Sequence, residues 1–216
     1  IQEWTNEECL RREKEIIGFY LSGDPLEKYI DDIKEFTNVD LANIPQKKPN
    51  IIRIGGIIKK TTIRYDKKNR PWAIVELSGS IGKADVFVFN DVFEKTKDHL
   101  TEDNCIFIGG SPSNRDDDAE SLKMIASNIF HLSCIREKLS KNINVLLPPQ
   151  INDASILNQI KELINQNKGK CGFIIHLQSE SGSIQEINAA KFRVNASKDF
   201  IFKLRALLGE KYVWIS

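Results

Sequence analysis

The sequence predicts a mixed fold: a small all-β barrel, preceded by α-helices and followed by a small α+β domain. Residues 51–132 contain five strand-like runs with one short helix between the third and the fourth, which is the element order of the OB-fold. Helical periodicity before this region and a β-α-β-β-α-β order after it complete the prediction. We therefore divide the chain into a helical segment and linker (1–50), an OB-fold domain (51–132) and a C-terminal α+β domain (133–216).

The first 50 residues predict two helices and a connector. Thr5–Glu8 forms a capping box before a helix through about Ile17, which Gly18 or Gly23 can end. Asp24 can cap a second helix. Its apolar stripe would consist of Leu26, Tyr29, Ile30, Ile33 and Phe36.

The first two strands of the barrel lie on either side of a lysine-rich turn. The first runs from Ile51 to about Tyr65, and its pair Gly55-Gly56 suits a bulge or bend in a long strand. Pro71 opens the second strand, in which alternation places one set of side chains on a single face. That set is Ala73, Val75 and Leu77.

The sequence of the second half of the barrel predicts a hairpin, a helix and two more strands. Gly79–Gly82 turns the chain into a third strand at 84–89, in which we expect Phe87 and Phe89 to pack under the following helix. Asp91 can cap that helix, which runs to about Leu100. Strands at 105–108 and 122–126 follow, joined by a loop from Ser113 to Glu120.

The C-terminal domain predicts a split βαβ arrangement. Its strands are expected at 143–147, 172–177, 187–194 and 212–215. One helix would carry Ile156, Ile160, Leu163 and Ile164 on one face, and Ser197 would cap the other, which bears Phe200, Leu204, Leu207 and Leu208.

Composition and motifs argue against catalysis, metals and membrane insertion. The four cysteines, Cys9, Cys105, Cys134 and Cys171, are widely spaced, which favours a reduced, cytoplasmic setting without disulfides or a metal site. We find no phosphate loop, nucleophile elbow or HExxH motif, no apolar run long enough to span a membrane and no export leader, so we expect no catalytic residue, no metal and no cofactor.

Isolated polar groups in the sequence have structural interpretations. We expect His99, His131 and His176 to be structural, and the acids of Arg115–Asp118 to lie on a solvated loop, because they lack the spacing of a calcium loop. The chain begins at Ile1 and not at methionine, which suggests a piece of a longer protein.

The charge distribution within the barrel is uneven and points to one basic edge. Residues 51–132 carry 12 basic and 12 acidic groups, but the first strand and the turn after it are strongly basic, whereas residues 101–120 hold six acids. Such a cluster with aromatic rings suits phosphate neutralisation and base stacking. We favour binding over simple solvation of the turn, and predict a nucleic-acid site formed by Arg53, Lys59, Lys60, Arg64, Tyr65, Lys67, Lys68, Arg70 and Trp72.

Several segments resemble one protein family. Glu13–Leu26 is similar to the segment that precedes the OB domain in the alpha subunit of bacterial DNA polymerase III, the family C replicative polymerase. The resemblance continues at Ile54–Ile58, Gly79–Phe89, Asp103-Asn104, Gly109-Gly110 and Leu207–Glu210, and so covers essentially the whole chain. The family usually has histidine where Asp24 stands, which suits Asp24 as a helix cap and removes any family role for its side chain.

The resemblance implies a non-catalytic C-terminal region of a DNA-directed DNA polymerase, a nucleotidyltransferase whose palm aspartates and internal clamp-binding motif lie upstream. It also implies single-stranded template DNA as the partner of residues 51–132 and the clamp-loader tau subunit as the partner of the last domain. The rest of the polymerase chain, and through it the sliding clamp, would be further partners.

Two alternatives stay open at this point. Since residues 51–132 have no net charge and one acidic edge, the OB-fold could be a purely structural or protein-binding module. It could also be an anticodon-binding RNA module of the kind appended to aminoacyl-tRNA synthetases, against which the Glu13–Leu26 segment argues.

Overall fold

The computed structural model describes residues 4–18, 20–113, 121–151 and 154–216. The chain forms two compact units, residues 1–133 and residues 134–216, each with its own hydrophobic core. The loop acids predicted to be solvated, Asp116–Asp118 with Arg115, lie outside the described residues, as does most of the Ser113–Glu120 loop.

The N-terminal helices begin and end close to where the sequence predicts. Helix α1 (Asn6–Ile17) has Thr5 as N-cap, whose hydroxyl accepts a hydrogen bond from the Glu8 backbone N–H, and left-handed Gly18 ends it. The Asp24 carboxylate accepts the Leu26 N–H, and the chain then forms a 3-10 turn, η1 (Glu27–Tyr29), before α2 (Ile30–Phe36). Leu26, Tyr29 and Phe36 of the predicted stripe are buried, whereas Ile30 is exposed.

The first unit contains a closed five-stranded barrel with the strand order β1-β2-β3-β5-β4. Its strands are β1 (Ile52–Tyr65), β2 (Pro71–Ser78), β3 (Lys83–Val88), β4 (Cys105–Pro112) and β5 (Leu122–His131). All neighbouring pairs are antiparallel except β3 and β5. This closure, with one helix between β3 and β4, confirms the predicted OB-fold.

Alternating side chains fill the barrel and leave every second position outside. Ala73, Val75 and Leu77 point inward and are at most 1% exposed, as the sequence predicts. Helix α3 (Asn90–Thr96), continued by the 3-10 turn η2 (Lys97–His99), contributes Phe93 to this core. The Asp91 cap is wrong, because the N-cap is Phe89 and no side chain caps the helix.

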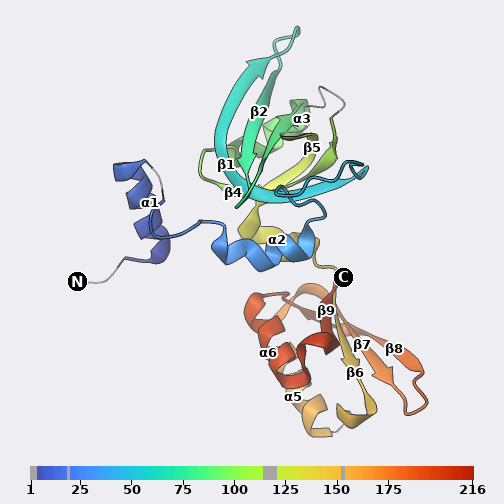
Figure 1. Ribbon diagram of the computed structural model, residues 1–216. Coiled ribbons are helices and arrows are strands. Elements are labelled where there is room, and N and C mark those ends of the chain that lie inside the picture. The colour runs from blue at the N-terminus through green and yellow to red at the C-terminus, as the bar shows by residue number, and fades with distance from the viewer. Residues whose placement is uncertain (1–3, 19, 114–120, 152–153) are drawn as a thin grey trace. The chain divides into compact units, whose positions relative to one another are not determined.

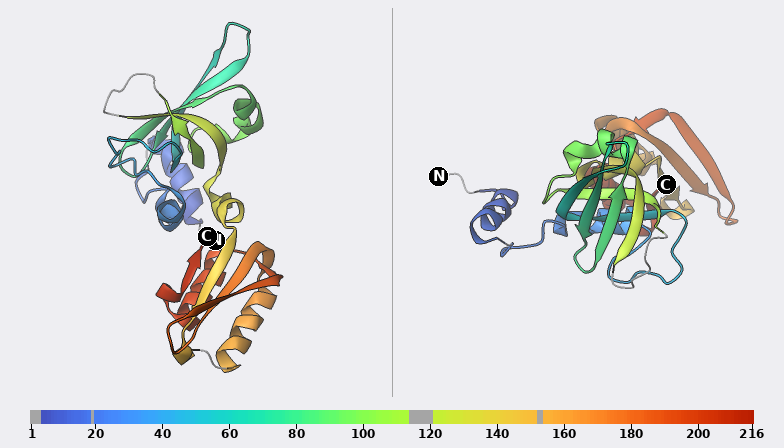
Figure 2. Two further views of the ribbon diagram at one scale, coloured as in Figure 1. Left: turned by 90° about the vertical axis from the view of Figure 1, so that its right-hand side faces the viewer. Right: turned by 90° about the horizontal axis from the view of Figure 1, so that it is seen from above.

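The bulge in strand β1 does not lie at the glycine pair that the sequence suggests for a bulge or bend. The register of β1 with β2 shifts between Ile58 and Lys60, and not at the glycine pair. Gly56 is needed instead for close approach, because a Cβ there would lie 2.6 Å from the Ser78 carbonyl oxygen. Beyond the barrel, the end of β1, the turn and the start of β2 project as a two-stranded hairpin arm (residues 63–72), visible in Figures 1 and 2.

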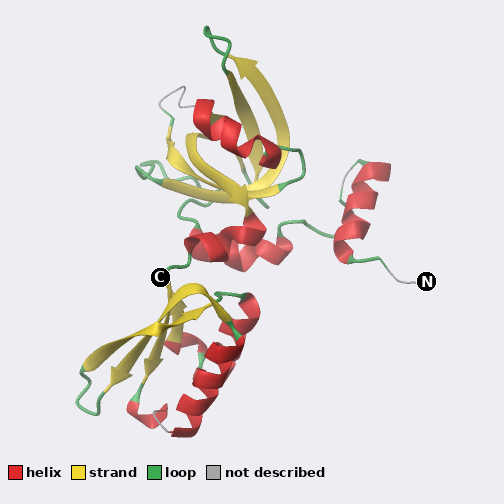
Figure 3. Ribbon diagram, turned by 180° about the vertical axis from the view of Figure 1, so that it is seen from behind, coloured by secondary structure: helices red, strands yellow, loops and turns green. Residues whose placement is uncertain are grey.

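The second unit has a four-stranded sheet of order β8-β7-β6-β9. After a short η3 (Leu132–Cys134) and α4 (Ile135–Leu139), the elements are β6 (Asn142–Leu147), η4 (Pro149–Ile151), α5 (Ala154–Gln166), β7 (Lys168–Gln178), β8 (Ile184–Val194), α6 (Lys198–Leu208), η5 (Glu210–Tyr212) and β9 (Val213–Ile215). Helices α5 and α6 cover one face of the sheet (Figure 3).

The β-α-β-β-α-β order of this unit is confirmed, but the predicted split is wrong. Strands β6 and β7 pair directly in parallel from Asn142↔Gly172 to Leu147↔Leu177, so no strand separates the two halves of the βαβ crossover. Strand β8 instead pairs with the outer side of β7, and β9 with the outer side of β6.

Candidate nucleic-acid interface

The outer face of β2 and β3 carries three aromatic rings in mutual contact, Trp72, Phe87 and Phe89, which we call the aromatic patch. The Trp72 ring lies 5.2 Å from that of Phe89 and 6.5 Å from that of Phe87, and the two phenyl rings stack 6.2 Å apart. All three side chains are half-buried. Their rings are therefore fixed by one another while part of each faces solvent.

Strand register explains why these rings meet. In β3, Ala84, Val86 and Val88 point into the barrel, so Phe87 must point outward. Phe89, just after the strand, continues this alternation and meets the Trp72 ring. Our expectation that the two phenylalanines pack under the following helix is wrong, although the alternation around Val86 and Val88 already contained the signal.

Basic side chains border the aromatic patch on the β1 side. Directly opposite residues of antiparallel strands share a face, and the register pairs Arg64 with Trp72 and Lys60 with Glu76. Arg64 and Lys60 are both exposed on this outer face. The patch therefore combines cationic side chains with rings, next to the acids Glu76 and Asp85, which are themselves paired across β2 and β3.

The turn at the tip of the hairpin arm holds three more of the predicted cations in a fixed loop. Asp66 Oδ1 accepts hydrogen bonds from the backbone N–H groups of Lys68 (2.8 Å) and Arg70 (2.9 Å), and its Oδ2 lies 2.7 Å from Arg70 Nη2. The Arg70 backbone bond, with those from its side chain and from Lys68, holds the Asp66 pKa below its usual value. Arg70 is therefore ion-paired within the turn, and the side chains of Lys67, Lys68 and Arg70 are all exposed.

The structure places three of the predicted residues away from this face. Because Tyr65 is opposite Pro71 while Trp72 is opposite Arg64, Tyr65 and Trp72 point to opposite faces of the hairpin arm. Arg53 is opposite Gly109, on the part of β1 that pairs with β4. Lys59 is the extra residue at the register shift between Ile58 and Lys60, and its Nζ lies 5.7 Å from the Tyr20 ring centroid.

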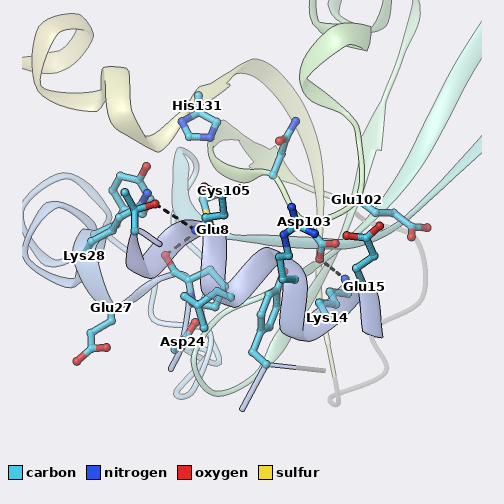
Figure 4. Close-up of a pocket in the computed structure, with 17 residues that line it drawn as sticks. Glu8, Lys14, Glu15, Asp24, Glu27, Lys28, Glu102, Asp103, Cys105 and His131 are labelled. Carbon is cyan, nitrogen blue, oxygen red and sulfur yellow. Dashed lines mark hydrogen bonds and ion pairs between the residues drawn. The ribbon is translucent and has the colours of Figure 1, made fainter. Parts of the chain in front are cut away.

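A separate pocket lies between the N-terminal segment and the barrel (Figure 4). The Lys14 ammonium forms an ion pair with the Asp103 carboxylate, which also hydrogen-bonds to Tyr20. Burial, followed by that hydrogen bond, raises the pKa of Tyr20. The pocket is rich in carboxylates (Glu8, Glu15, Asp24, Glu27, Glu102 and Asp103), so it does not suit a phosphate backbone.

The described residues contain no group of three or more metal-ligating side chains, and no helix among them is both long and apolar enough to cross a bilayer. His176 and His131 each form a hydrogen bond to a neighbour: His176 to Asn144 at 3.1 Å and His131 to Ser133 at 2.8 Å.

No protein-family model matches the chain.

Curated proteins named DNA polymerase III subunit alpha align with this chain over almost its whole length. The protein from Escherichia coli K12 is 25% identical over 215 residues, covering 98% of this chain and 18% of its own length. Those of Borreliella burgdorferi (26% identity; 99% and 19% covered) and Pseudomonas aeruginosa (23%; 100% and 18%) are similar. The chain resembles DNA polymerase III subunit alpha. The predicted resemblance is thus confirmed, and the chain spans less than a fifth of these alpha subunits.

Solved structures with a likeness to the chain include single-stranded DNA-binding proteins. Rim1, a mitochondrial single-stranded DNA-binding protein from S. cerevisiae, has a TM-score of 0.32 at 14% identity, covering 38% of this chain and 94% of its own. The SSB domain of a Synechococcus protein has a TM-score of 0.32 at 15% identity, covering 40% and 100%. Because these scores are low, the OB-fold assignment depends on the strand order and pairing of the barrel itself.

Proposed function

We propose that this chain is the C-terminal, non-catalytic region of a bacterial replicative DNA polymerase, and that its OB-fold binds single-stranded template DNA. One observation carries the proposal: the aromatic patch lies on the β2–β3 face with Arg64 beside Trp72. This face and the turn between β1 and β2 are where OB-folds commonly bind oligonucleotides. The similarity to polymerase alpha subunits supports the same assignment.

The chemistry expected of this site is stacking combined with weak phosphate neutralisation. Bases would stack on the open sides of Trp72 and Phe89, and Arg64, Lys67 and Lys68 would contact successive phosphates. The net charge of residues 51–132 is zero, with 12 basic and 12 acidic groups, so long-range attraction would be small. Within the parent polymerase, the site would hold a template strand that the catalytic domains already retain.

A salt titration tests the phosphate contacts. The triple variant K67A/K68A/R70A should bind a labelled oligothymidylate more weakly, with a salt slope reduced by about 0.7 for each phosphate that is no longer neutralised. The control K34A/K95A/K97A removes the same charge from exposed positions on α2, α3 and η2 and should bind like the wild type. Equal affinities and slopes for both variants would refute the role of the turn.

A protein-binding role is the second candidate, and Glu76 and Asp85 are the observation that favours it. These acids lie side by side on the same outer face as the aromatic patch and would repel phosphates near them. No binding of either DNA or RNA oligonucleotides even at low salt would favour this role. Preference for RNA loops over DNA would instead favour an RNA-binding module.

For the second unit we propose docking of the clamp-loader tau subunit, in a cytoplasmic replication assembly. The proposal follows from the resemblance of the chain to polymerase alpha subunits, which implies tau as the partner of the last domain. The helical layer supports it, because Phe202 on α6 is 72% exposed and Leu157 on α5 is 39% exposed. A pull-down of the chain with tau, repeated with F202D and with the control K203D, should lose tau only in the first variant.

A further inference from the structure

The second unit has a sheet face that its helices leave uncovered, and this face carries an aromatic pair. Inward-pointing Ile143, Val145 and Phe173 pack under α5 and α6. The alternate residues of β6, β7 and β9 therefore point to the other face. Among them, the Trp214 ring stacks on the imidazole of His176, 5.0 Å away and inclined by 26°.

This stack lies beside a buried, hydrogen-bonded asparagine. Trp214 and Ile174 are both register partners of Asn144 on the central strand β6. Asn144 is 4% exposed, and its amide group bonds to His176 Nε2 at 3.1 Å and to Ser216 Oγ at 3.0 Å. The His176 ring is thus fixed by a buried polar group and the Trp214 ring by its stack on His176, while Trp214 stays 38% exposed.

Exposed cations collect at the end of the sheet next to this stack. The start of β7 carries Lys168 and Lys170, the end of β8 carries Lys191 and Arg193, and Lys141 directly precedes β6. Gly172 is the register partner of both Arg193 and Asn142, so the end of β8 lies in a row two residues along the strands from the row of Ile174, Asn144 and Trp214, across β7 and β6 from β9. Glu137 pairs with Lys170 at 3.2 Å, and the carboxylate of Glu186 lies opposite His176 on β8. The expected positive charge is therefore confined to the end of the sheet, where Lys191 and Arg193 are joined by Lys141 and by Lys168, the register partner of Val194.

We propose that this uncovered face is a second single-stranded nucleic-acid site, in which a base stacks on Trp214 and the flanking phosphates contact Lys168, Lys191 and Arg193. The argument is charge complementarity together with a preformed ring platform, the combination that holds single strands without reading their sequence. It is independent of the aromatic patch on the barrel. A protein partner on this face would need to match a cationic rim, whereas a phosphate backbone matches it directly.

Photo-cross-linking locates the contact in the full 216-residue chain. An oligothymidylate carrying 5-iododeoxyuridine should cross-link at Trp214 or His176, in addition to the aromatic patch, when the peptides are mapped by mass spectrometry. Cross-links confined to the barrel would overturn the proposal. Cross-links confined to the barrel are also the result expected if this uncovered face binds a protein and not a nucleic acid.

Binding measurements test the charges separately from the barrel. In a background that disables the barrel site (W72L/K67A/K68A), the added changes K168Q/K191Q/R193Q should weaken the remaining binding and lower its salt slope by about 0.7 for each phosphate that is no longer neutralised. The matched control K161Q/K198Q/K203Q removes three cations from α5 and α6 and should leave it unchanged. Equal binding by the two variants would contradict the proposal.

Substitution of the ring completes the test. W214L removes the stacking surface but keeps an apolar cover over Asn144, and W214F keeps both. We expect W214L to weaken the remaining binding and W214F to restore most of it, with far-UV circular dichroism of both variants equal to that of the parent. Equal binding by the two folded variants would show that the ring takes no part. If W214L does not fold, the charge variants and the cross-links decide the question.

Discussion

At the scale of single residues, the face of the strand on which each aromatic ring lies decides whether that ring belongs to the barrel site. Trp72 and Tyr65 are seven positions apart and near opposite ends of one turn, so the sequence alone groups them. The register separates them, because Tyr65 is opposite Pro71 and Trp72 is opposite Arg64. Only Trp72 lies beside Phe89 and Phe87.

This separation predicts unequal effects of the two rings on binding. W72L should weaken binding of a single-stranded oligonucleotide by about 5- to 100-fold, the range for loss of one stacked base. Y65L should change it much less, since Tyr65 is 65% exposed on the other face of the hairpin arm. Fluorescence anisotropy with both variants checks this. A larger loss of affinity in Y65L than in W72L would place the binding site on the Tyr65 face of the hairpin arm and contradict the proposed site.

Asp66 predicts how the tip of the hairpin arm responds to acid. Its carboxylate accepts the Arg70 and Lys68 backbone N–H groups, so its pKa in the folded state is below the usual value. A lowered pKa means that this stabilisation is present above the unfolded pKa, near 4, and is lost as the pH falls through the folded pKa.

We therefore expect the turn to be unchanged between pH 8 and pH 5 and to loosen only below about pH 4. The Arg70 side-chain Nε–H resonance in an NMR titration measures this. In D66N, the same resonance should have lost its acid transition. A transition near pH 6 in the parent chain would contradict the assignment.

At the scale of elements, the β2–β3 hairpin depends on a close contact with the linker that precedes the barrel. Gly82 in its turn has a φ of 84°, and a Cβ there would lie 2.0 Å from the Leu41 carbonyl oxygen. Gly182, in the β7–β8 turn, has a φ of 83° but no neighbour within 4 Å. The two glycines differ in their surroundings and share nearly the same φ.

Alanine substitutions at Gly182 and Gly82 distinguish the cost of backbone strain alone from the cost of strain together with steric overlap. G182A should cost about 1 kcal/mol of unfolding free energy, the penalty of a left-handed alanine alone. G82A should cost clearly more, because the linker must also move. Urea denaturation of each variant measures both values, and equal losses would mean that the linker yields freely at Leu41.

The junction between α1 and the barrel predicts sensitivity to alkali. Tyr20 is partly buried beside Asp103, so its pKa is raised. A raised pKa means that the neutral phenol stabilises the fold fully below the unfolded pKa, near 10, and that this stabilisation is lost as the pH rises further. The absorbance of tyrosinate at 295 nm should show one late-titrating group that is absent from Y20F.

Element identity was readable from the sequence, but partners across elements were not. The inward set Ala73, Val75 and Leu77 follows from alternation within one strand. The parallel pairing of β6 with β7 depends on how strands far apart in the chain assemble, which an element order of β-α-β-β-α-β leaves open. The Asp66–Arg70 bond likewise needs the turn conformation, in which Asn69 has a φ of 59°.

At the scale of the whole molecule, two separate cores predict two separable unfolding transitions. Ile106 belongs to the barrel core and Leu204 to the core of the second unit, and both are fully buried. I106A should lower the stability of one transition by about 2–5 kcal/mol, and L204A should lower the other by a similar amount. Tryptophan fluorescence and circular dichroism in denaturant resolve them, and a shared shift would show one cooperative unit.

The register shift in β1 has a consequence for how this chain can change length over evolution. Lys59 and Lys60 are neighbours in sequence, yet one lies over the Tyr20 ring and the other is paired with Glu76 on the outer face of the barrel. Loss of the extra residue would turn every later side chain of the strand by half a repeat and move Arg64 away from Trp72. Insertions of two residues in the hairpin arm would preserve the binding face, whereas insertions of one would invert it.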